Sequence, residues 1–286
     1  MSDLLQPPRV VVVDAVERAL AEDLTPLGDL TSALLPQDLV ATARFVARTT
    51  GVLAGRACAA ETFVQVDPTV SLTWSVDDGD SVRPGTLIAT ATGRLASILT
   101  AERTALNFLG HLSGIATLTS QYVAEATKGG SAYVWDTRKT TPGLRVLEKA
   151  AVRAGGGRNH RGNLSDWILL KDNHIAMFGI TDAVARSRSM WPARTVHVEC
   201  DTIDQVNEAL AAGADALLLD NMTPDQIREC VAVASASPRR PLLEASGGIT
   251  LETIAGYSAA GVDCISVGGL TNSAPVLDIG LDIDPA

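Results

Sequence analysis

The stretch TVHVECDTIDQVNEALAAGADALLLDN, residues 195–221, predicts a strand, a helix and a second strand in succession. Its two apolar runs, at 195–199 and 216–220, each end in a carboxylate, and apolar side chains recur at helical spacing between them. Two strands of one sheet that are joined through a helix run parallel to each other. The stretch therefore predicts an α/β fold built on a parallel sheet.

The same alternation of strand and helix extends over the second half of the chain. Strands are expected at AYVWDT, WILLK, TVHVE, ALLLD, LLEA and CISVG, and helices near 143–154, 180–190, 203–211, 224–235 and 250–259. The later strand ends, at Glu199, Asp220, Ala245 and Val267, are separated by 21, 25 and 22 residues. Six such strands predict an irregular or partial TIM-like α/β barrel, and a doubly wound sheet is the alternative.

The first part of the chain has a different pattern. The runs VATARFVART, TVSLTWSV and TLIATATG alternate apolar and small polar residues at period two, which is typical of strands. GRACAAETFVQV predicts a helix between them, and residues 1–24 predict a capping helix. A long helix is expected from Leu95 to Lys128. We therefore expect a smaller α+β sandwich domain over residues 1–112, followed by the barrel domain over residues 113–286.

Positive charge is concentrated in one segment of an acidic chain. The 286 residues carry a net charge of -10, yet residues 136–171 hold eight Lys/Arg against three Asp/Glu, a local +5 that leaves -15 for the rest. Such an island indicates either a pocket for a small polyanion or a solvated helix face. Arg145, Lys149 and Arg153 recur at helical spacing and favour the solvated face. The acidic remainder disfavours a nucleic-acid surface.

The other cations of this segment favour the pocket. Arg138 and Lys139 come directly after one predicted strand, and Lys171 ends the next. His160 and Arg161 lie in a glycine-rich loop between these strands. Strand ends and loops are where a rigid scaffold presents its binding groups.

In barrels of this type the site is formed by the residues directly after each strand. Those positions hold Thr137, Arg138, Lys139, Lys171, Glu199, Asp220, Ser246, Gly247, Gly248, Gly268 and Gly269. The two glycine pairs offer backbone N–H groups with no side chain in the way, which suits a phosphate. The two carboxylates suit a sugar held by its hydroxyls, or Mg²⁺ on a phosphorylated ligand.

The cysteines and the N-terminus bear on where the chain works. Cys58, Cys200, Cys230 and Cys264 are far apart and match no metal-binding spacing, so we expect them to be reduced and the protein to be cytoplasmic. No apolar run reaches the length of a membrane span, and no basic segment precedes an apolar core at the N-terminus. We expect neither a signal peptide nor a membrane partner.

The motifs DTRKTTPGLR, GGGRNHR, LLKDNH, LLLDN, EASGGI and SVGGLTNS, together with LTAERTALNFLGHLSGIAT, closely resemble the quinolinate phosphoribosyltransferase family over nearly the whole chain. That family is also called nicotinate-nucleotide pyrophosphorylase (carboxylating). The resemblance implies a two-domain type II phosphoribosyltransferase of de novo NAD synthesis. Quinolinate and phosphoribosyl pyrophosphate would give nicotinate mononucleotide, pyrophosphate and CO₂, with Mg²⁺ as cofactor.

The resemblance also implies roles for individual residues. The pyridine dicarboxylate would be surrounded by Arg103, Arg138, His160, Arg161 and Lys171. The 5′-phosphate would be bound by Ser246, Gly247, Gly248, Gly268 and Gly269. Lys139 would lie between the dicarboxylate and the pyrophosphate, and Glu199 and Asp220 would hold the ribose hydroxyls or the metal. Thr137 and Val267 complete the substrate-binding set, and the catalytic residues would be Lys139, Lys171, Glu199 and Asp220.

The resemblance bears on assembly as well, and the chain departs from the family at one position. The family places Arg103 in the pocket of the neighbouring subunit, so a homodimer with a shared active site is implied, and a higher oligomer is compatible with it. The family usually has histidine where this chain has Asn272, which puts one phosphate contact in doubt.

Two alternative functions are a related phosphoribosyltransferase for another anionic acceptor and a non-catalytic ligand sensor. The complete set of cations and carboxylates disfavours the sensor.

Overall fold

The computed structural model describes residues 6–283, which form two compact units. The first unit comprises the chain up to Ser120, Thr140–Gly156 and the segment from Leu270 onward; the second comprises Gln121–Lys139 and Gly157–Gly269. This division is discontinuous along the chain, unlike the single boundary between residues 112 and 113 expected from the sequence. Residues 1–5 of the predicted capping helix, and 284–286 of the predicted barrel domain, lie outside the described residues.

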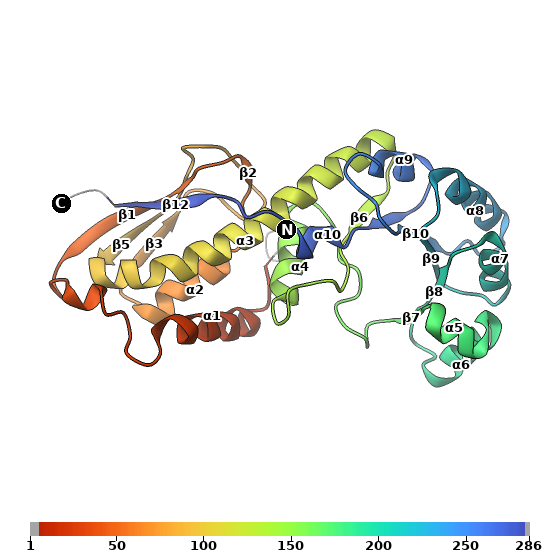
Figure 1. The fold of residues 1–286 in the computed structure, drawn as a ribbon, viewed down its shortest axis with the longest axis horizontal. Helices are drawn as coiled ribbons and strands as arrows, with labels where there is room; N and C mark the ends of the chain where they lie inside the picture. The colour runs from red at the N-terminus through yellow and green to blue at the C-terminus, as the bar shows by residue number, and fades with distance from the viewer. Residues whose placement is uncertain (1–5, 284–286) are drawn as a thin grey trace. The chain divides into compact units, whose positions relative to one another are not determined.

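The first unit contains an antiparallel sheet with the strand order β12-β1-β5-β3 (Figure 1). Its strands are β1 (Val40–Ala47), β3 (Ser71–Trp74), β5 (Leu87–Arg94) and β12 (Ile279–Ile283), and a small second sheet pairs β2 (Gly51–Val52) with β4 (Ser81–Val82). Strands β1, β3 and β5 confirm the three predicted runs. Strand β12 was not predicted, because its pairing with β1 joins Ile283 to Ala43, which lie at opposite ends of the chain.

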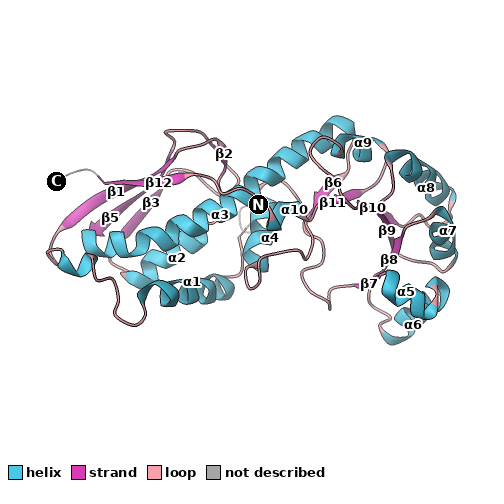
Figure 2. Ribbon diagram, viewed as in Figure 1, coloured by secondary structure: helices cyan, strands magenta, loops and turns pink. Residues whose placement is uncertain are grey.

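Helices complete the first unit (Figure 2). They are α1 (Arg9–Leu24), the short 3₁₀ helix η2 (Ser32–Leu34), α2 (Arg56–Val66), α3 (Leu95–Gly129) and α4 (Arg145–Ala154). One apolar cluster joins β1, α2, β5 and α3 through the buried side chains of Phe45, Phe63, Ile88, Ile98 and Leu109. The predicted sandwich core is therefore present, and α3 continues beyond it into the second unit, which begins at Gln121.

Helix α4 corrects one expectation. Lys149 was interpreted as part of a solvated helix face, but its relative exposure is 5 %, and Glu148 beside it is fully buried. Glu148 accepts a hydrogen bond from the backbone N–H of Thr141 at 3.1 Å and pairs with Nε2 of His111 at 2.9 Å. The helix therefore packs on more than one side, which helical spacing of charges does not reveal.

The second unit contains a six-stranded parallel sheet with the order β6-β11-β10-β9-β8-β7. Its strands are β6 (Tyr133–Trp135), β7 (Ile168–Leu170), β8 (Val196–Cys200), β9 (Ala216–Asp220), β10 (Leu242–Ser246) and β11 (Cys264–Ser266). The edge strands β6 and β7 are not paired with each other in the part of the chain that is described, so the barrel is TIM-like but open. This confirms the predicted partial barrel.

Helices lie outside the curved sheet of the second unit in Figure 1. They are α5 (Asp172–Phe178), α6 (Ile180–Met190), α7 (Ile203–Ala211), α8 (Pro224–Ala236) and α9 (Ile254–Ala259). The short α10 (Gly269–Asn272) follows β11 and belongs mostly to the first unit. Thr202 and Thr223 begin α7 and α8 as N-caps, each accepting a hydrogen bond from the N–H three residues later. Helices α5 and α10 were not predicted, because each is too short for a clear apolar period.

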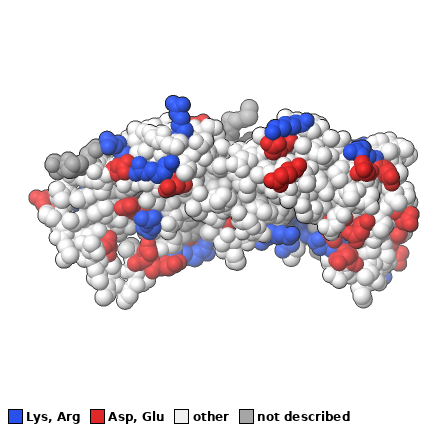
Figure 3. All heavy atoms as spheres, turned by 45° about the horizontal axis from the view of Figure 1, so that its top comes forward, with Lys and Arg blue, Asp and Glu red and all other residues white. Residues whose placement is uncertain are grey.

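Charged side chains of both signs lie on the surface. Basic and acidic groups are interspersed on the face shown in Figure 3. Among the described residues, no helix combines the length and the apolar character that crossing a bilayer requires.

Asp67 is a buried carboxylate in the first unit that makes several hydrogen bonds. Its side chain is 4 % exposed. It accepts from the hydroxyl of Thr69 at 2.6 Å, the hydroxyl of Ser97 at 2.7 Å and the guanidinium of Arg94 at 2.7 and 2.9 Å. These donors, Thr69 first, hold the pKa of Asp67 well below its ordinary value.

Replacing Asp67 by asparagine should lower the free energy of unfolding by about 1–3 kcal/mol at pH 7, because charged hydrogen bonds are lost. A depressed carboxyl pKa stabilises the fold above the unfolded pKa of about 4, and this contribution declines as the pH falls below it. The difference between wild type and variant should therefore shrink below about pH 4. Urea unfolding over a pH series measures it, with the exposed Asp38→Asn as the control. A difference that stayed constant with pH would contradict a role for the charge.

Candidate active site

The carboxyl ends of the strands in the second unit surround one cavity of about 400 Å³. It is lined by Thr137, Arg138, Lys139, His160, Arg161, Leu169, Lys171, Glu199, Leu218, Asp220, Glu244, Ser246 and Ser266. All of these except Leu169, Leu218, Glu244 and Ser266 were predicted from the sequence. The structure therefore brings together side chains from β6 to β11 that are more than a hundred residues apart.

Strand alternation explains which side chains face the cavity. Val198, Leu217 and Leu219 are fully buried on the helix side of the sheet, and the residues between them point the other way. Glu199 on β8 and Asp220 on β9 thus share one face. The four lining residues that sequence reasoning missed obey the same rule, because each lies on this face within a strand. A carboxylate such as Glu244, in the otherwise apolar run LLEA, was the available signal.

The remaining predicted residues lie elsewhere. Gly247, Gly248, Val267, Gly268 and Gly269 come after β10 and β11 in the second unit but do not line the cavity itself. Arg103 on α3 and Asn272 on α10 belong to the first unit, where both side chains are exposed. Within the second unit, the structure therefore assembles the predicted set without these two.

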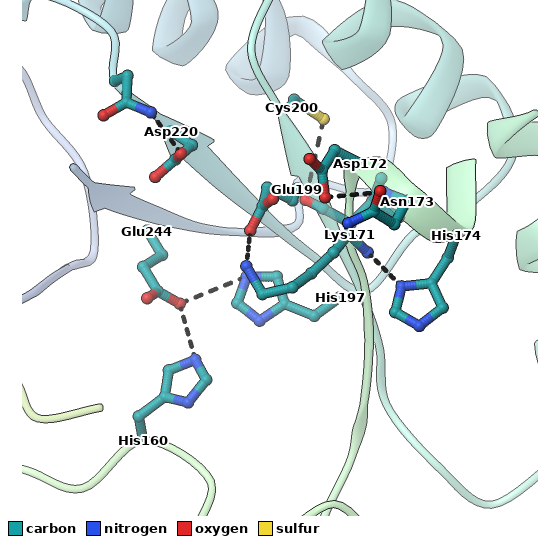
Figure 4. Close-up of polar contacts among 12 residues, drawn as sticks. His160, Lys171, Asp172, Asn173, His174, His197, Glu199, Cys200, Asp220 and Glu244 are labelled. Atoms are coloured by element: carbon teal, nitrogen blue, oxygen red, sulfur yellow. Dashed lines mark hydrogen bonds and ion pairs between the residues drawn. The ribbon is translucent and has the colours of Figure 1, made fainter. Parts of the chain in front are cut away.

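Lys171 and Glu199 form an ion pair across the ends of β7 and β8 (Figure 4). The side chain of Glu199 is 9 % exposed, and that of Lys171 is 46 % exposed. The carboxylate is thus held at the cavity wall by a cation that also reaches solvent. An anionic ligand can therefore compete with Glu199 for Lys171.

Asp136 positions the loop that carries His160 and Arg161. It is fully buried directly after β6, and it accepts hydrogen bonds from the backbone N–H of His160 at 2.8 Å and from Nδ2 of Asn159 at 2.6 Å. The backbone of Arg158 also pairs with β6, donating to the carbonyl of Val134 at 2.8 Å. The glycine-rich segment is therefore anchored to the sheet, and its two basic side chains line the cavity.

Arg161 shows the electrostatic character of the cavity. Its relative exposure is 7 %, and Nη1 donates to the carbonyl of Trp167 at 3.3 Å. Burial lowers the pKa of Arg161, and the neighbouring charge of Arg138 lowers it further. Two like charges facing one partly buried space attract an anion that neutralises both.

Glu244 lines the cavity, and Nε2 of the buried His197 lies 3.5 Å from its carboxylate. Burial alone would raise the pKa of Glu244, but the imidazoles of His160 and His197 and the hydroxyl of Ser266 hold it below its ordinary value. Burial also lowers the pKa of His197, despite the charge of Glu244 nearby. The charged form of the Glu244 carboxylate and the neutral form of the His197 imidazole are thus favoured beside each other.

Two glycines lie close to other groups, and at Gly247 the neighbour includes backbone, which cannot move aside. Gly247 has φ +99°, and a Cβ there would lie 2.3 Å from Oδ1 and 2.7 Å from the backbone nitrogen of Asn221. A Cβ on Gly268 would lie 2.8 Å from Cδ of Lys139. By contrast, the space around the Cβ positions of Gly248 and Gly269 is open to 4 Å. Gly247 is thus closely packed, whereas Gly248 and Gly269 have free space that could admit a phosphate.

The fold and the site together define a class of protein. An open parallel barrel gathers four cations, carboxylates and glycine turns at the ends of its strands, which suits an enzyme that acts on small phosphorylated and carboxylated ligands. The family models specify it further. Residues 29–113 match the quinolinate phosphoribosyl transferase N-terminal domain, and residues 115–282 match the C-terminal domain. The chain belongs to the quinolinate phosphoribosyltransferase family.

Individual relatives agree with the family models. The chain is 43% identical over 276 residues to nicotinate-nucleotide pyrophosphorylase [carboxylating] of Mycobacterium leprae, covering 94% of this chain and 96% of the relative. It is also 43% identical over 258 residues to a probable enzyme of that name from Bacillus subtilis, covering 90% and 88%. The solved nicotinate-nucleotide pyrophosphorylase from Francisella tularensis has a TM-score of 0.93 at 38% identity and covers 98% of both chains.

Proposed function

We propose that this chain is a decarboxylating quinolinate phosphoribosyltransferase of de novo NAD biosynthesis. It transfers the phosphoribosyl group of phosphoribosyl pyrophosphate to the ring nitrogen of quinolinate and yields nicotinate mononucleotide, pyrophosphate and CO₂. The observation that carries the proposal is the cavity in which Arg138, Lys139, Arg161 and Lys171 face Glu199 and Asp220 in a chain of this family.

The cations of the cavity suit the acceptor. Quinolinate carries two neighbouring carboxylates, which repel each other in a partly buried site unless cations pair with them. The guanidinium groups of Arg138 and Arg161 can each bind a carboxylate through two parallel hydrogen bonds. Lys171 supplies a third charge when it exchanges Glu199 for the acceptor, and the same exchange releases Glu199 toward the ribose.

The remaining groups suit the transfer itself. The ring nitrogen forms a bond to C1 of the ribose as the bond from C1 to pyrophosphate breaks, and Glu199 and Asp220 stabilise the positive charge that develops on the ribosyl group. Lys139 stabilises the departing pyrophosphate. The quaternary nitrogen then stabilises the electron pair left when CO₂ departs from the adjacent carbon, which gains a proton. This step requires no separate decarboxylating cofactor.

Glu199 and Asp220 also fit the Mg²⁺ that the family resemblance implies. Both present carboxylate oxygens to the same cavity, and Mg²⁺ is usually held by one or two carboxylates together with substrate phosphates. When bound, Mg²⁺ neutralises charge on the pyrophosphate.

We further propose that the enzyme works in the cytoplasm. All four cysteines are free and buried, and burial raises the pKa of the Cys58 thiol to about 12. Such thiols are inert and need no oxidising compartment.

A proposed homodimer with a shared site gives a complementation test. Arg103 is exposed on α3, as a residue reaching into a partner's cavity must be. Arg103→Ala and Lys139→Ala should each be inactive alone. Mixed under subunit exchange, they should recover up to about a quarter of wild-type specific activity, the share expected for random pairing with one intact site per mixed dimer. Exchange proven by tagged subunits without recovered activity would exclude sharing.

Gly247→Ala should raise the KM for phosphoribosyl pyrophosphate by about 5-fold to 150-fold, the equivalent of about 1–3 kcal/mol of backbone strain. The added methyl meets the backbone of Asn221 at a positive φ. Gly248→Ala is the matched control, because its φ is +58° and no atom lies within 4 Å, so its effect should be smaller. Equal effects in steady-state kinetics would show that steric contact with Asn221 is unimportant.

The activity itself is tested with purified protein, quinolinate, phosphoribosyl pyrophosphate and Mg²⁺. NMR should show nicotinate mononucleotide appearing as quinolinate is consumed. Consumption of phosphoribosyl pyrophosphate only with another carboxylated acceptor would favour the related transferase instead. Binding without turnover of any acceptor would favour the sensor.

A further inference from the structure

Three buried side chains converge beside the candidate active site (Figure 4). His160, His197 and Glu244 have relative exposures of 7 %, 2 % and 0 %. Nε2 of His160 lies 3.4 Å, and Nε2 of His197 lies 3.5 Å, from the same carboxylate oxygen of Glu244. One possible metal-ligating atom from each residue lies within 4.8 Å of the other two.

Several polar atoms of this cluster lack suitable protein partners. Both carboxylate oxygens of Glu244 and Nε2 of His197 make no hydrogen bond of normal geometry among the described residues. Nε2 of His197 instead lies 3.5 Å from a carboxylate oxygen of Glu244. A cation between these buried polar atoms would satisfy them together.

Two of the three separations in the cluster match tetrahedral coordination. Ligand distances of about 2.0–2.1 Å from Zn²⁺ place neighbouring ligand atoms of a tetrahedron about 3.3 Å apart. The observed separations of 3.4 and 3.5 Å are close to this value. The Leu217 carbonyl also supplies the kind of outer hydrogen bond that orients a metal-binding histidine.

We propose that His160, His197 and Glu244 form a binding site for a transition-metal ion of the Zn²⁺ class. Nε2 of each histidine and one carboxylate oxygen are the protein ligands. The fourth position faces the cavity, which His160 and Glu244 also line and through which the ion enters.

This site differs in chemistry from the proposed Mg²⁺ site at Glu199 and Asp220. Two imidazoles and one carboxylate favour Zn²⁺ and its neighbours in the transition series, whereas Mg²⁺ prefers oxygen ligands and octahedral geometry. Mg²⁺ at assay concentrations should therefore leave the cluster empty. If the proposed function is correct, an ion at the cluster occupies His160, which the acceptor also uses, so Zn²⁺ inhibits in competition with quinolinate.

Metal binding is measured on the full chain without any substrate. In equilibrium dialysis against Zn²⁺ with excess Mg²⁺, the wild type should bind one equivalent. With Co²⁺ in its place, the intense visible absorption of a tetrahedral complex should appear. His197→Gln and Glu244→Gln should each weaken binding at least about 100-fold, because even loss of an outer partner weakens metal sites 10- to 100-fold. The matched control is His111→Gln, which alters a histidine–glutamate pair with a normal 2.9 Å contact and should leave binding unchanged.

The wild-type measurement decides the proposal even if a variant fails to fold. Failure to bind one equivalent of Zn²⁺, weak octahedral absorption with Co²⁺, or full binding by both folded variants would overturn it. Phthalate, an aromatic dicarboxylate without a ring nitrogen to chelate metal, should weaken Zn²⁺ binding by the wild type. If saturating phthalate left the affinity for Zn²⁺ unchanged, the assignment of the fourth position to the cavity would be overturned. None of these readouts depends on turnover, so they stand apart from the test of the proposed function.

Discussion

Replacing Lys171 by methionine should lower kcat/KM for quinolinate by about 30-fold to several-thousand-fold. The substitution removes one of the cations that face the acceptor, and it leaves the carboxylate of Glu199, which is 9 % exposed, without its ion-pair partner. Removing one partner of a buried charged pair typically costs about 2–5 kcal/mol, which corresponds to that range of binding, and the partial exposure of Lys171 favours its lower end. Methionine keeps most of the side-chain volume, so the loss reports the charge.

Steady-state kinetics with quinolinate as the varied substrate measure the effect of Lys171→Met. Lys171→Arg keeps the charge with a different shape and should be less impaired. Lys128→Met removes an equivalent charge from the exposed pair with Glu125 and should be close to wild type. A Lys171→Met enzyme with kcat/KM close to that of the wild type would remove Lys171 from the acceptor site.

Nicotinate should bind about 30-fold to several-thousand-fold more weakly than quinolinate. It lacks the carboxylate next to the ring nitrogen, so at least one of Arg138, Arg161 and Lys171 would lack a ligand carboxylate in a partly buried cavity. An uncompensated charge of this kind costs about 2–5 kcal/mol. Because Arg161 is 7 % exposed, water only partly replaces the missing carboxylate.

Isothermal titration with quinolinate, nicotinate and phthalate measures this difference directly. Phthalate keeps both carboxylates and has no nucleophilic nitrogen, so it should bind and inhibit in competition with quinolinate. Arg161→Lys should reduce the preference for the dicarboxylates, because lysine cannot form the paired hydrogen bonds of a guanidinium. Nicotinate that bound as tightly as quinolinate would exclude the dicarboxylate pocket.

Most of the barrel was predictable because each of its strands is marked by a pattern of neighbouring residues. Each strand of the second unit is a short apolar run, and β8 and β9 lie within one residue of the expected TVHVE and ALLLD. The positions directly after the strands gave most of the cavity, since parallel strands place their carboxyl ends at one edge. Strand β12 was not predictable in the same way, because a short run such as IGLDI becomes a strand only beside β1.

The misses within the site have a common cause. Glu244 and His197 lie inside apolar strands rather than after them, so a search of strand ends passed over both. Their proximity depends on the register of neighbouring strands, in which His197 and Leu218 lie on one face with Glu244 of β10. Lys149 on α4 was misjudged for a similar reason, because helical spacing shows which side chains share a face but not what packs against it.

The sequence by itself determined the class of fold, the order of the main strands and helices of the second unit, the family, and the cations of the cavity with the carboxylates of Glu199 and Asp220. These depend on apolar periodicity and on short motifs, which act over a few residues. Tertiary structure alone decided the pairing of β12 with β1, the open edge of the barrel, the ion pair of Lys171 with Glu199 and the meeting of His160, His197 and Glu244. Each of these depends on contacts between residues distant in the chain, which strand register and packing fix and local pattern does not.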